Sequence, residues 1–180
     1  IIIKVAVAKV GIMIFKSFNI LVGGSGFIGS RLGNLFAEEE FQIFDKNPSV
    51  AFPYKVNLGD VRDLMALRQH LAGAGVVVLL AAEHRDDVVP VSLYYEVNVE
   101  GARNVVQVMR EHDIRRLIFT STVAVYGLNR ESPKETDEVN PFGDYGQSKW
   151  EAEEVLRGWW QEAPDERELV IVRPCVVFGE

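Results

Sequence analysis

Three glycines at a fixed spacing constrain the fold of this chain more than any other feature. Gly23, Gly26 and Gly29 directly follow the apolar run Phe18–Val22 and precede a segment of helical period. The first two glycines permit a tight turn and let a pyrophosphate approach backbone N–H groups at a helix N-terminus, and the third lets the helix pack closely on the strand. The spacing alone is weakly specific, but between a strand and a helix it predicts a dinucleotide-binding unit.

After residue 17, short apolar runs alternate with longer segments of helical period, which is the pattern of a parallel sheet covered on both faces. The expected strands are Phe18–Val22, Phe41–Phe44, Tyr54–Val56, Val76–Leu80, Arg116–Thr120 and Leu169–Val172. The expected helices are Phe27–Glu39, Arg62–Leu71, Ser92–His112 and Asp144–Gln161. Right-handed crossovers predict a doubly wound Rossmann sheet in the order 3-2-1-4-5-6, in a three-layer α/β/α arrangement with ligands at the carboxyl ends of the strands.

The length of 180 residues favours one domain, which we assign to residues 17–180 as an NAD-binding Rossmann domain. Residues 1–16 form an apolar extension of uncertain origin; Lys4 and Lys9 interrupt it, and it is shorter than the ~20 residues of a membrane helix. A net charge of -7 argues against nucleic acid as a partner.

The cysteine and histidine content indicates a reducing compartment and no metal site. Cys175 is the single cysteine, so no internal disulfide can form and a cytoplasmic location is expected. It lies in an apolar run beside Pro174, where we expect a buried packing role. The three histidines have no pair at ligand spacing, so we expect no metal.

Two acidic residues follow predicted strands where a nucleotide would bind. Asp45 ends the second strand about twenty residues past the glycines, where its carboxylate can bind the adenosine ribose hydroxyls and repel a 2′-phosphate. This favours NAD over NADP, although the neighbouring Lys46 leaves the alternative open. Asp60, followed by Val61, can meet the adenine amino group or cap the helix expected at Arg62.

Tyr145 and Lys149 are four positions apart on a predicted helix, so their side chains share a face. An ammonium group near a phenol favours the phenolate, which predicts a lowered tyrosine pKa and a general base. The spacing is common, and a surface pair is the alternative. The glycine motif upstream and the hydroxyl residues Thr120–Thr122 favour the catalytic interpretation.

Several further motifs together identify the chain as a member of the extended short-chain dehydrogenase/reductase family, in its NAD-dependent epimerase/dehydratase branch. The resemblance covers residues 18–180 and rests on Gly-Gly-Ser-Gly-Phe-Ile-Gly at 23–29, Gly-Asp-Val-Arg-Asp at 59–63, Asn98-Val99-x-Gly101, Ser-Thr-Val-Ala-Val-Tyr-Gly at 121–127, Tyr145-Gly-Gln-Ser-Lys149, and Arg173-Pro174 with Phe178-Gly179.

The resemblance implies a site. Its catalytic set is Thr122, Tyr145 and Lys149, and Lys149 would also hold the nicotinamide ribose. Its cofactor contacts are Gly23, Gly26, Phe27, Ile28, Gly29, Asp45, Asp60, Val61, Ala81, Ala82, Asn98, Tyr145 and Lys149. Asn98 has an alternative role, which is to tie a helix to a neighbouring strand.

The residues after Thr122 separate the reactions of this family. Its nucleotide-sugar 4,6-dehydratases usually carry Asp-Glu there, because eliminating water needs a further acid and base, whereas this chain has Val123 and Ala124. The chain therefore resembles the C4 epimerases, which remove one hydride to NAD and return it through a 4-keto intermediate. A dehydratase, a reductase of the same family and a non-catalytic dinucleotide sensor are the alternatives.

A finer similarity concerns the substrate. The Glu-His-Arg-Asp-Asp loop at 83–87, Ser92-Leu-Tyr-Tyr95 and Lys149-Trp150 resemble family members that act on lipid-linked N-acetylhexosamine diphosphates. The loop lies near the cofactor or substrate in that interpretation and is a solvated connection in the alternative. A nucleotide sugar remains the other substrate class. The resemblance also implies a C-terminal substrate lobe missing from this chain, at most peripheral membrane contact, and a homodimer formed through helices 92–112 and 144–161.

Overall fold

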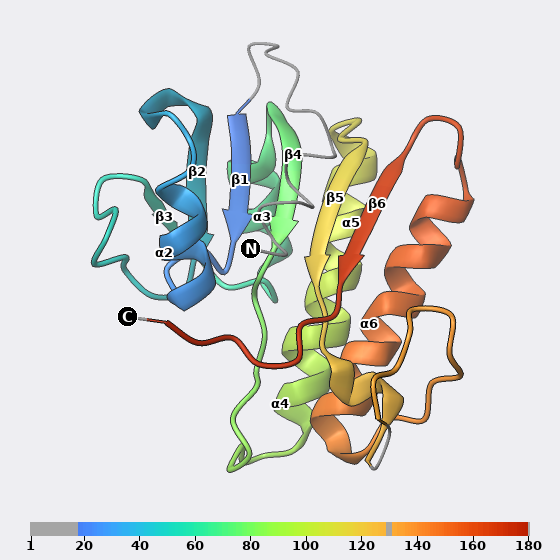
Figure 1. Cartoon of the computed structure of the whole chain (residues 1–180). Helices are drawn as coiled ribbons and strands as arrows, with labels where there is room; N and C mark the ends of the chain where they lie inside the picture. Colours follow the sequence, from blue (N-terminus) through green and yellow to red (C-terminus); the bar gives the residue numbers. More distant parts are fainter. Residues whose placement is uncertain (1–17, 129–130, 180) are drawn as a thin grey trace.

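Six parallel strands form the centre of the computed structural model, which describes residues 18–128 and 131–179 (Figure 1). The strands are β1 Phe18–Val22, β2 Phe41–Asp45, β3 Val56–Leu58, β4 Ala74–Leu79, β5 Arg116–Thr120 and β6 Glu168–Val172. Their order is β3-β2-β1-β4-β5-β6, so the predicted topology is confirmed. The expected extension at 1–16 lies outside the described residues.

Helices cover both faces of the sheet. The helical segments are α2 Phe27–Gly33, η1 Glu38–Glu40, α3 Leu64–Leu71, α4 Ser92–Tyr95, η2 Glu96–Glu100, α5 Gly101–Glu111, η3 Val123–Tyr126 and α6 Gly143–Gln161. α2 lies on the face turned toward the viewer in Figure 1, while α3 and α5 lie behind the sheet. The three-layer Rossmann architecture is therefore confirmed.

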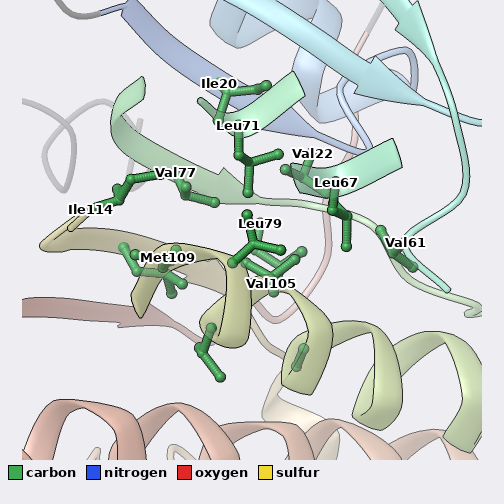
Figure 2. Close-up of a cluster of buried hydrophobic side chains, with 14 of the residues drawn as sticks. Ile20, Val22, Val61, Leu67, Leu71, Val77, Leu79, Val105, Met109 and Ile114 are labelled. Carbon is green, nitrogen blue, oxygen red and sulfur yellow. The ribbon is translucent and has the colours of Figure 1, made fainter. Parts of the chain in front are cut away.

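All strands except the short β3 contribute side chains to two separate cores, because successive residues point to opposite faces. In β1, Ile20 and Val22 pack with α3, α5 and α6, while Leu21 packs on the side of α2. Figure 2 shows the first cluster, in which Val105 from α5 lies among residues from the strands and from α3. Trp159 from α6 is also buried there, as expected for an aromatic residue packing in the core. Burial on both faces explains why the strands are almost wholly apolar.

The helix expected from Arg62 begins at Leu64, and the strand expected at Val76–Leu80 runs from Ala74 to Leu79. The first helix and the third strand also differ from their predicted bounds, because tight turns intervene. α2 ends at Gly33 and not at Glu39, since the N–H groups of Leu35 and Phe36 bond to carbonyls three residues back. The third strand was expected at Tyr54–Val56, but Tyr54 is 99 % exposed and β3 begins at Val56. A hydrogen bond from the Lys55 N–H to the Phe52 carbonyl closes a turn just before it.

The helix expected at Ser92–His112 is interrupted by a π-helical segment. α4, η2 and α5 follow one another without a break, and η2 carries Asn98. Such π-helical bulges change the direction in which side chains leave a helix and are frequent at functional sites. No helix in the described part of the chain is long and apolar enough to cross a membrane.

Candidate active site

A cavity of about 810 Å³ opens at the carboxyl ends of the strands. Loops after β1 to β6 and the first turns of α6 form its walls. All the predicted site residues except Asn98 line it: Gly23, Gly26, Phe27, Ile28, Gly29, Asp45, Asp60, Val61, Ala81, Ala82, Thr122, Tyr145 and Lys149. The fold therefore brings together residues that lie more than a hundred positions apart in the sequence.

The glycine loop has the shape of a cradle for a phosphate-containing ligand. Gly23 has a φ of 81°, and a Cβ there would lie 2.3 Å from the Ala81 nitrogen. A Cβ at Gly29 would lie 2.1 Å from the Gly24 carbonyl oxygen, so only glycine permits this approach of helix and loop. At Gly26, no atom would lie nearer than 4.0 Å to an added Cβ. The loop is thus tightly packed at two glycines and open at the third, which fits a dinucleotide pyrophosphate.

Asp45 is fixed between the ends of β1 and β2. Its carboxylate accepts hydrogen bonds from the N–H groups of Ser25 and Asn47, at 2.9 and 2.8 Å. The Ser25 hydroxyl in turn donates to the Asn47 carbonyl at 2.8 Å. Asp45 is 9 % exposed and faces the cavity, so its orientation is set before a ribose binds. Ser25 was not singled out in the sequence, although its place inside the glycine motif makes this contact local.

Asp60 does not cap the following helix. α3 begins at Leu64, and the cap is Asp63, whose carboxylate accepts from the N–H groups of Met65 and Ala66. Asp60 instead binds Arg62 through two side-chain hydrogen bonds, and the guanidinium holds the pKa of the Asp60 carboxyl below its usual range. Because Asp60 also lines the cavity, the nucleotide-binding interpretation remains a prediction while the capping alternative was wrong.

Asn98 holds a helix to neighbouring elements, which was the alternative to contacting the cofactor. The buried amide accepts a hydrogen bond from the Glu83 N–H at 2.8 Å and donates to the Glu83 carbonyl at 3.0 Å. It also donates to the Ser148 hydroxyl at 2.9 Å. The side chain therefore ties the loop after β4 to α6 and does not line the cavity.

Thr122, Tyr145 and Lys149 meet at the α6 side of the cavity. Thr122 caps η3, with its hydroxyl accepting from the Ala124 N–H at 3.1 Å. A hydrogen bond with Thr122 lowers the Tyr145 pKa, but burial raises that pKa more strongly. The net shift is upward, so the expected lowering of the Tyr145 pKa by Lys149 was wrong.

Lys149 is also shifted in pKa, because burial makes its own ammonium form unfavourable. Its side chain is 1 % exposed, and its Nζ lies 4.1 Å from the centre of the Phe119 ring. Burial lowers the Lys149 pKa to about 7, against the opposing influence of Glu153. At neutral pH the ammonium and neutral amine are therefore both populated, and a bound ligand can shift the balance.

A buried cluster next to these residues was not predicted from the sequence. Glu153 is fully buried on α6 and accepts hydrogen bonds from the Ser121 hydroxyl and from Arg173. Arg173 also donates to the Tyr126 hydroxyl at 2.5 Å. The available signal was spacing, because Tyr145, Lys149 and Glu153 recur every four positions along one helix face.

Cys175 is exposed, which corrects the expected buried packing role. The chain leaves the sheet after β6 and crosses the carboxyl ends of the strands toward α2 (Figure 1). Cys175 and Val177 therefore line the cavity, and Phe178 is 87 % exposed. The apolar run was misread because it continues past the last strand residue into this crossing segment.

Known proteins are similar to this chain in sequence and in fold. The family model described as NAD dependent epimerase/dehydratase family matches residues 20–180. The N-acetyl-alpha-D-glucosaminyl-diphospho-ditrans,octacis-undecaprenol 4-epimerase of Escherichia coli O157:H7 is 54% identical over 162 residues, covering 89% of this chain and 49% of that protein. A UDP-glucose 4-epimerase of Lacticaseibacillus casei is 29% identical, over 88% of this chain and 51% of that protein.

Solved structures agree with this relationship. UDP-glucose 4-epimerase from Brucella ovis in complex with NAD has a TM-score of 0.77 at 26% identity, covering 87% of this chain and 51% of its own. The Thermus thermophilus UDP-glucose 4-epimerase complex with NAD has a TM-score of 0.73 at 28% identity, over 86% and 54%. The chain thus spans about half the length of the proteins it matches. The motifs, the fold and the sequence matches agree, and the chain belongs to the NAD-dependent epimerase/dehydratase family.

Proposed function

We propose that this chain is the cofactor-binding part of an NAD-dependent C4 epimerase that acts on a sugar diphosphate. The observation that carries the proposal is one cavity whose two ends are lined by residues suited to different tasks, cofactor binding at one end and proton transfer at the other. The glycine cradle and Asp45 lie at one end, and Thr122, Tyr145 and Lys149 lie at the other. Val123 and Ala124 follow the hydroxyl residue, so no carboxylate stands in the positions that a family dehydratase uses.

The residues at the adenosine end fit NAD. The open Gly26 position leaves room for a pyrophosphate, and the fixed carboxylate of Asp45 accepts hydrogen bonds from ribose hydroxyls. A 2′-phosphate would meet the charge of Asp45, which disfavours NADP. When bound, NAD supplies a hydride acceptor that can return the hydride within the same turnover.

The chain's own residues move the proton. Tyr145, as phenolate, takes the proton from the sugar 4-hydroxyl while Thr122 hydrogen-bonds the same oxygen. Lys149, once protonated, stabilises the phenolate and holds the nicotinamide ribose through its ammonium. Loss of this proton together with transfer of the C4 hydride to bound NAD would leave a 4-keto sugar. If that sugar presents its other face, return of the hydride to C4 and of the proton from Tyr145 would invert C4.

The relatives support a proposal for the substrate class. A sugar carried on diphospho-undecaprenol is our first candidate, because the relative named for that substrate shares 54% identity, and UDP-linked sugars are the second. A lipid-linked substrate would bring the protein to the inner membrane surface from the cytoplasm. We also propose a homodimer in which α5 and α6 of two copies form a four-helix bundle, since these helices pack side by side behind the sheet.

Turnover of candidate sugars by the full-length protein, without added NAD, tests the proposal. A C4 epimer formed with retained cofactor supports it. Net consumption of NADPH would identify a reductase, loss of water a dehydratase, and no reaction with bound NAD a sensor. Comparing UDP-N-acetylglucosamine, UDP-glucose and the lipid-linked N-acetylglucosamine diphosphate separates the substrate classes.

A matched pair of tyrosine variants assigns the base. Tyr145→Phe removes one hydroxyl from the cavity and should abolish turnover while sparing NAD binding. Tyr54→Phe removes a hydroxyl from a residue that is 99 % exposed and should change neither. An active Tyr145→Phe enzyme would overturn the role of Tyr145.

A further inference from the structure

The Glu153–Arg173 ion pair is buried beside the reacting groups and has no part in the proton transfer. The two Arg173 nitrogens lie 2.8 and 2.6 Å from the Glu153 carboxylate oxygens. Glu153 is fully buried, and the Arg173 side chain is 8 % exposed. Desolvating such a pair offsets most of its attraction, so the pair is poorly explained by stability alone.

The pair connects three elements that bear on the active site. Glu153 lies on α6, two helical turns from Tyr145. Its carboxylate also accepts a hydrogen bond from the Ser121 hydroxyl at 2.6 Å. Ser121 immediately precedes Thr122. Arg173 follows β6 and holds Tyr126, at the end of η3, which Thr122 begins. The segment carrying Thr122 is thus attached to Glu153 of α6 at both ends, directly through Ser121 and by way of Arg173 through Tyr126.

Glu153 also faces Lys149 across one helical turn. The Glu153 carboxylate is surrounded by the Arg173 guanidinium, the Ser121 hydroxyl, Lys149 and Arg157. A nitrogen of Arg157 lies 3.3 Å from this carboxylate on the solvent side. Tyr126 adds a phenol beyond Arg173. Burial reduces solvent screening between them, so the charge of Glu153 favours the ammonium form of Lys149 and opposes the larger effect of burial on the Lys149 pKa.

We propose that Glu153 and Arg173 are positioning residues of the active site: together they fix Thr122 against the helix of Tyr145, and the Glu153 carboxylate supplies the negative charge that faces Lys149. This inference rests on the proposed function for its effect on turnover. Its effect on Lys149 does not depend on any sugar chemistry. The two parts can therefore be tested separately.

Glu153→Gln in the full-length protein tests the charge with little change in shape. We expect kcat to fall at least tenfold, with the sugar KM and the bound NAD content within twofold of wild type. We also expect the alkaline limb of the pH profile to move down by about one pH unit, since an opposite charge at close range raises a lysine pKa by about that amount or more. Glu154→Gln, one position away and exposed, is the matched control and should match wild type.

Two further measurements keep the test decisive. NMR of lysine labelled at 13Cε, with the Lys149 signal assigned by its loss in Lys149→Met, should show a lower Lys149 pKa in Glu153→Gln whether or not any sugar reacts. Glu153→Asp keeps the charge and should restore that titration while leaving kcat reduced, because the shorter side chain loses Ser121. If the wild-type protein epimerises no sugar, the proposed function fails and the NMR result still decides the charge.

Other outcomes would overturn the positioning role. A folded Glu153→Gln protein with wild-type kcat and an unchanged Lys149 titration contradicts both parts. If Glu153→Gln does not fold, Ser121→Ala takes its place, because it removes the 2.6 Å contact without altering charge. We expect Ser121→Ala to lower kcat several-fold with no change in the Lys149 titration, and an unchanged kcat would refute the positioning of Thr122.

Discussion

Replacing Lys149 by methionine should stabilise the folded chain, and by an amount that depends on pH. The Lys149 pKa is lowered from 10.5 to about 7 because the amine is buried. A lysine with a lower pKa when folded makes the folded state bind fewer protons than the unfolded state. Its penalty is therefore full below pH 7 and disappears as the pH rises toward 10.5. Methionine fills a similar volume and carries no such penalty.

The size of the effect follows from the two pKa values. The gap between 10.5 and about 7 corresponds to about 5 kcal/mol, at about 1.4 kcal/mol per pH unit. Proton linkage between these values gives a penalty that is about 4 kcal/mol smaller at pH 10 than at pH 6. The stability advantage of Lys149→Met over wild type should decrease by that amount across this range.

Urea unfolding of the purified chain at pH 6, 8 and 10 measures this difference. Lys134→Met is the matched control, because Lys134 is exposed and its replacement should change stability by less than about 0.5 kcal/mol at every pH. Equal pH dependence of Lys149→Met and wild type would refute the reasoning, since it would mean that Lys149 keeps an ordinary pKa when folded.

Three further predictions concern the cofactor cradle and the base. Gly29→Ala places a Cβ 2.1 Å from the Gly24 carbonyl oxygen and should abolish NAD binding in calorimetry, whereas Gly158→Ala, with nothing within 4 Å, should stabilise the chain by about 0.5–1 kcal/mol in urea unfolding. Asp45→Ala should weaken NAD binding about 10- to 100-fold, because charge-assisted hydrogen bonds to the ribose are lost, and should improve NADP binding relative to NAD. An unchanged preference in titrations with both nucleotides would contradict the role of Asp45. Tyr145→Phe should lose turnover in a coupled sugar assay and keep NAD, and residual wild-type rates would exclude it as the base.

Local signals in the sequence were sufficient for the sheet and for most of the cavity lining. Apolar runs and glycine spacing place β1 and β5 at their observed ends, and they place Asp45 and Tyr145 at the same edge of the sheet, because parallel strands direct their carboxyl ends to one side. Among the boundaries that failed, those at Gly33 and Tyr54 depend on turns and on packing against Phe52, which no local pattern reports.

The sequence by itself determined the fold, the family and most of the residues that meet in the cavity. Only the tertiary structure decided their chemical state. Lys149 and Tyr145 have the expected spacing, but burial sets their pKa values, and burial is a property of everything packed around them. The Glu153–Arg173 pair likewise joins α6 to the end of β6, twenty residues apart, so its contact and its charge appear only when the chain is folded.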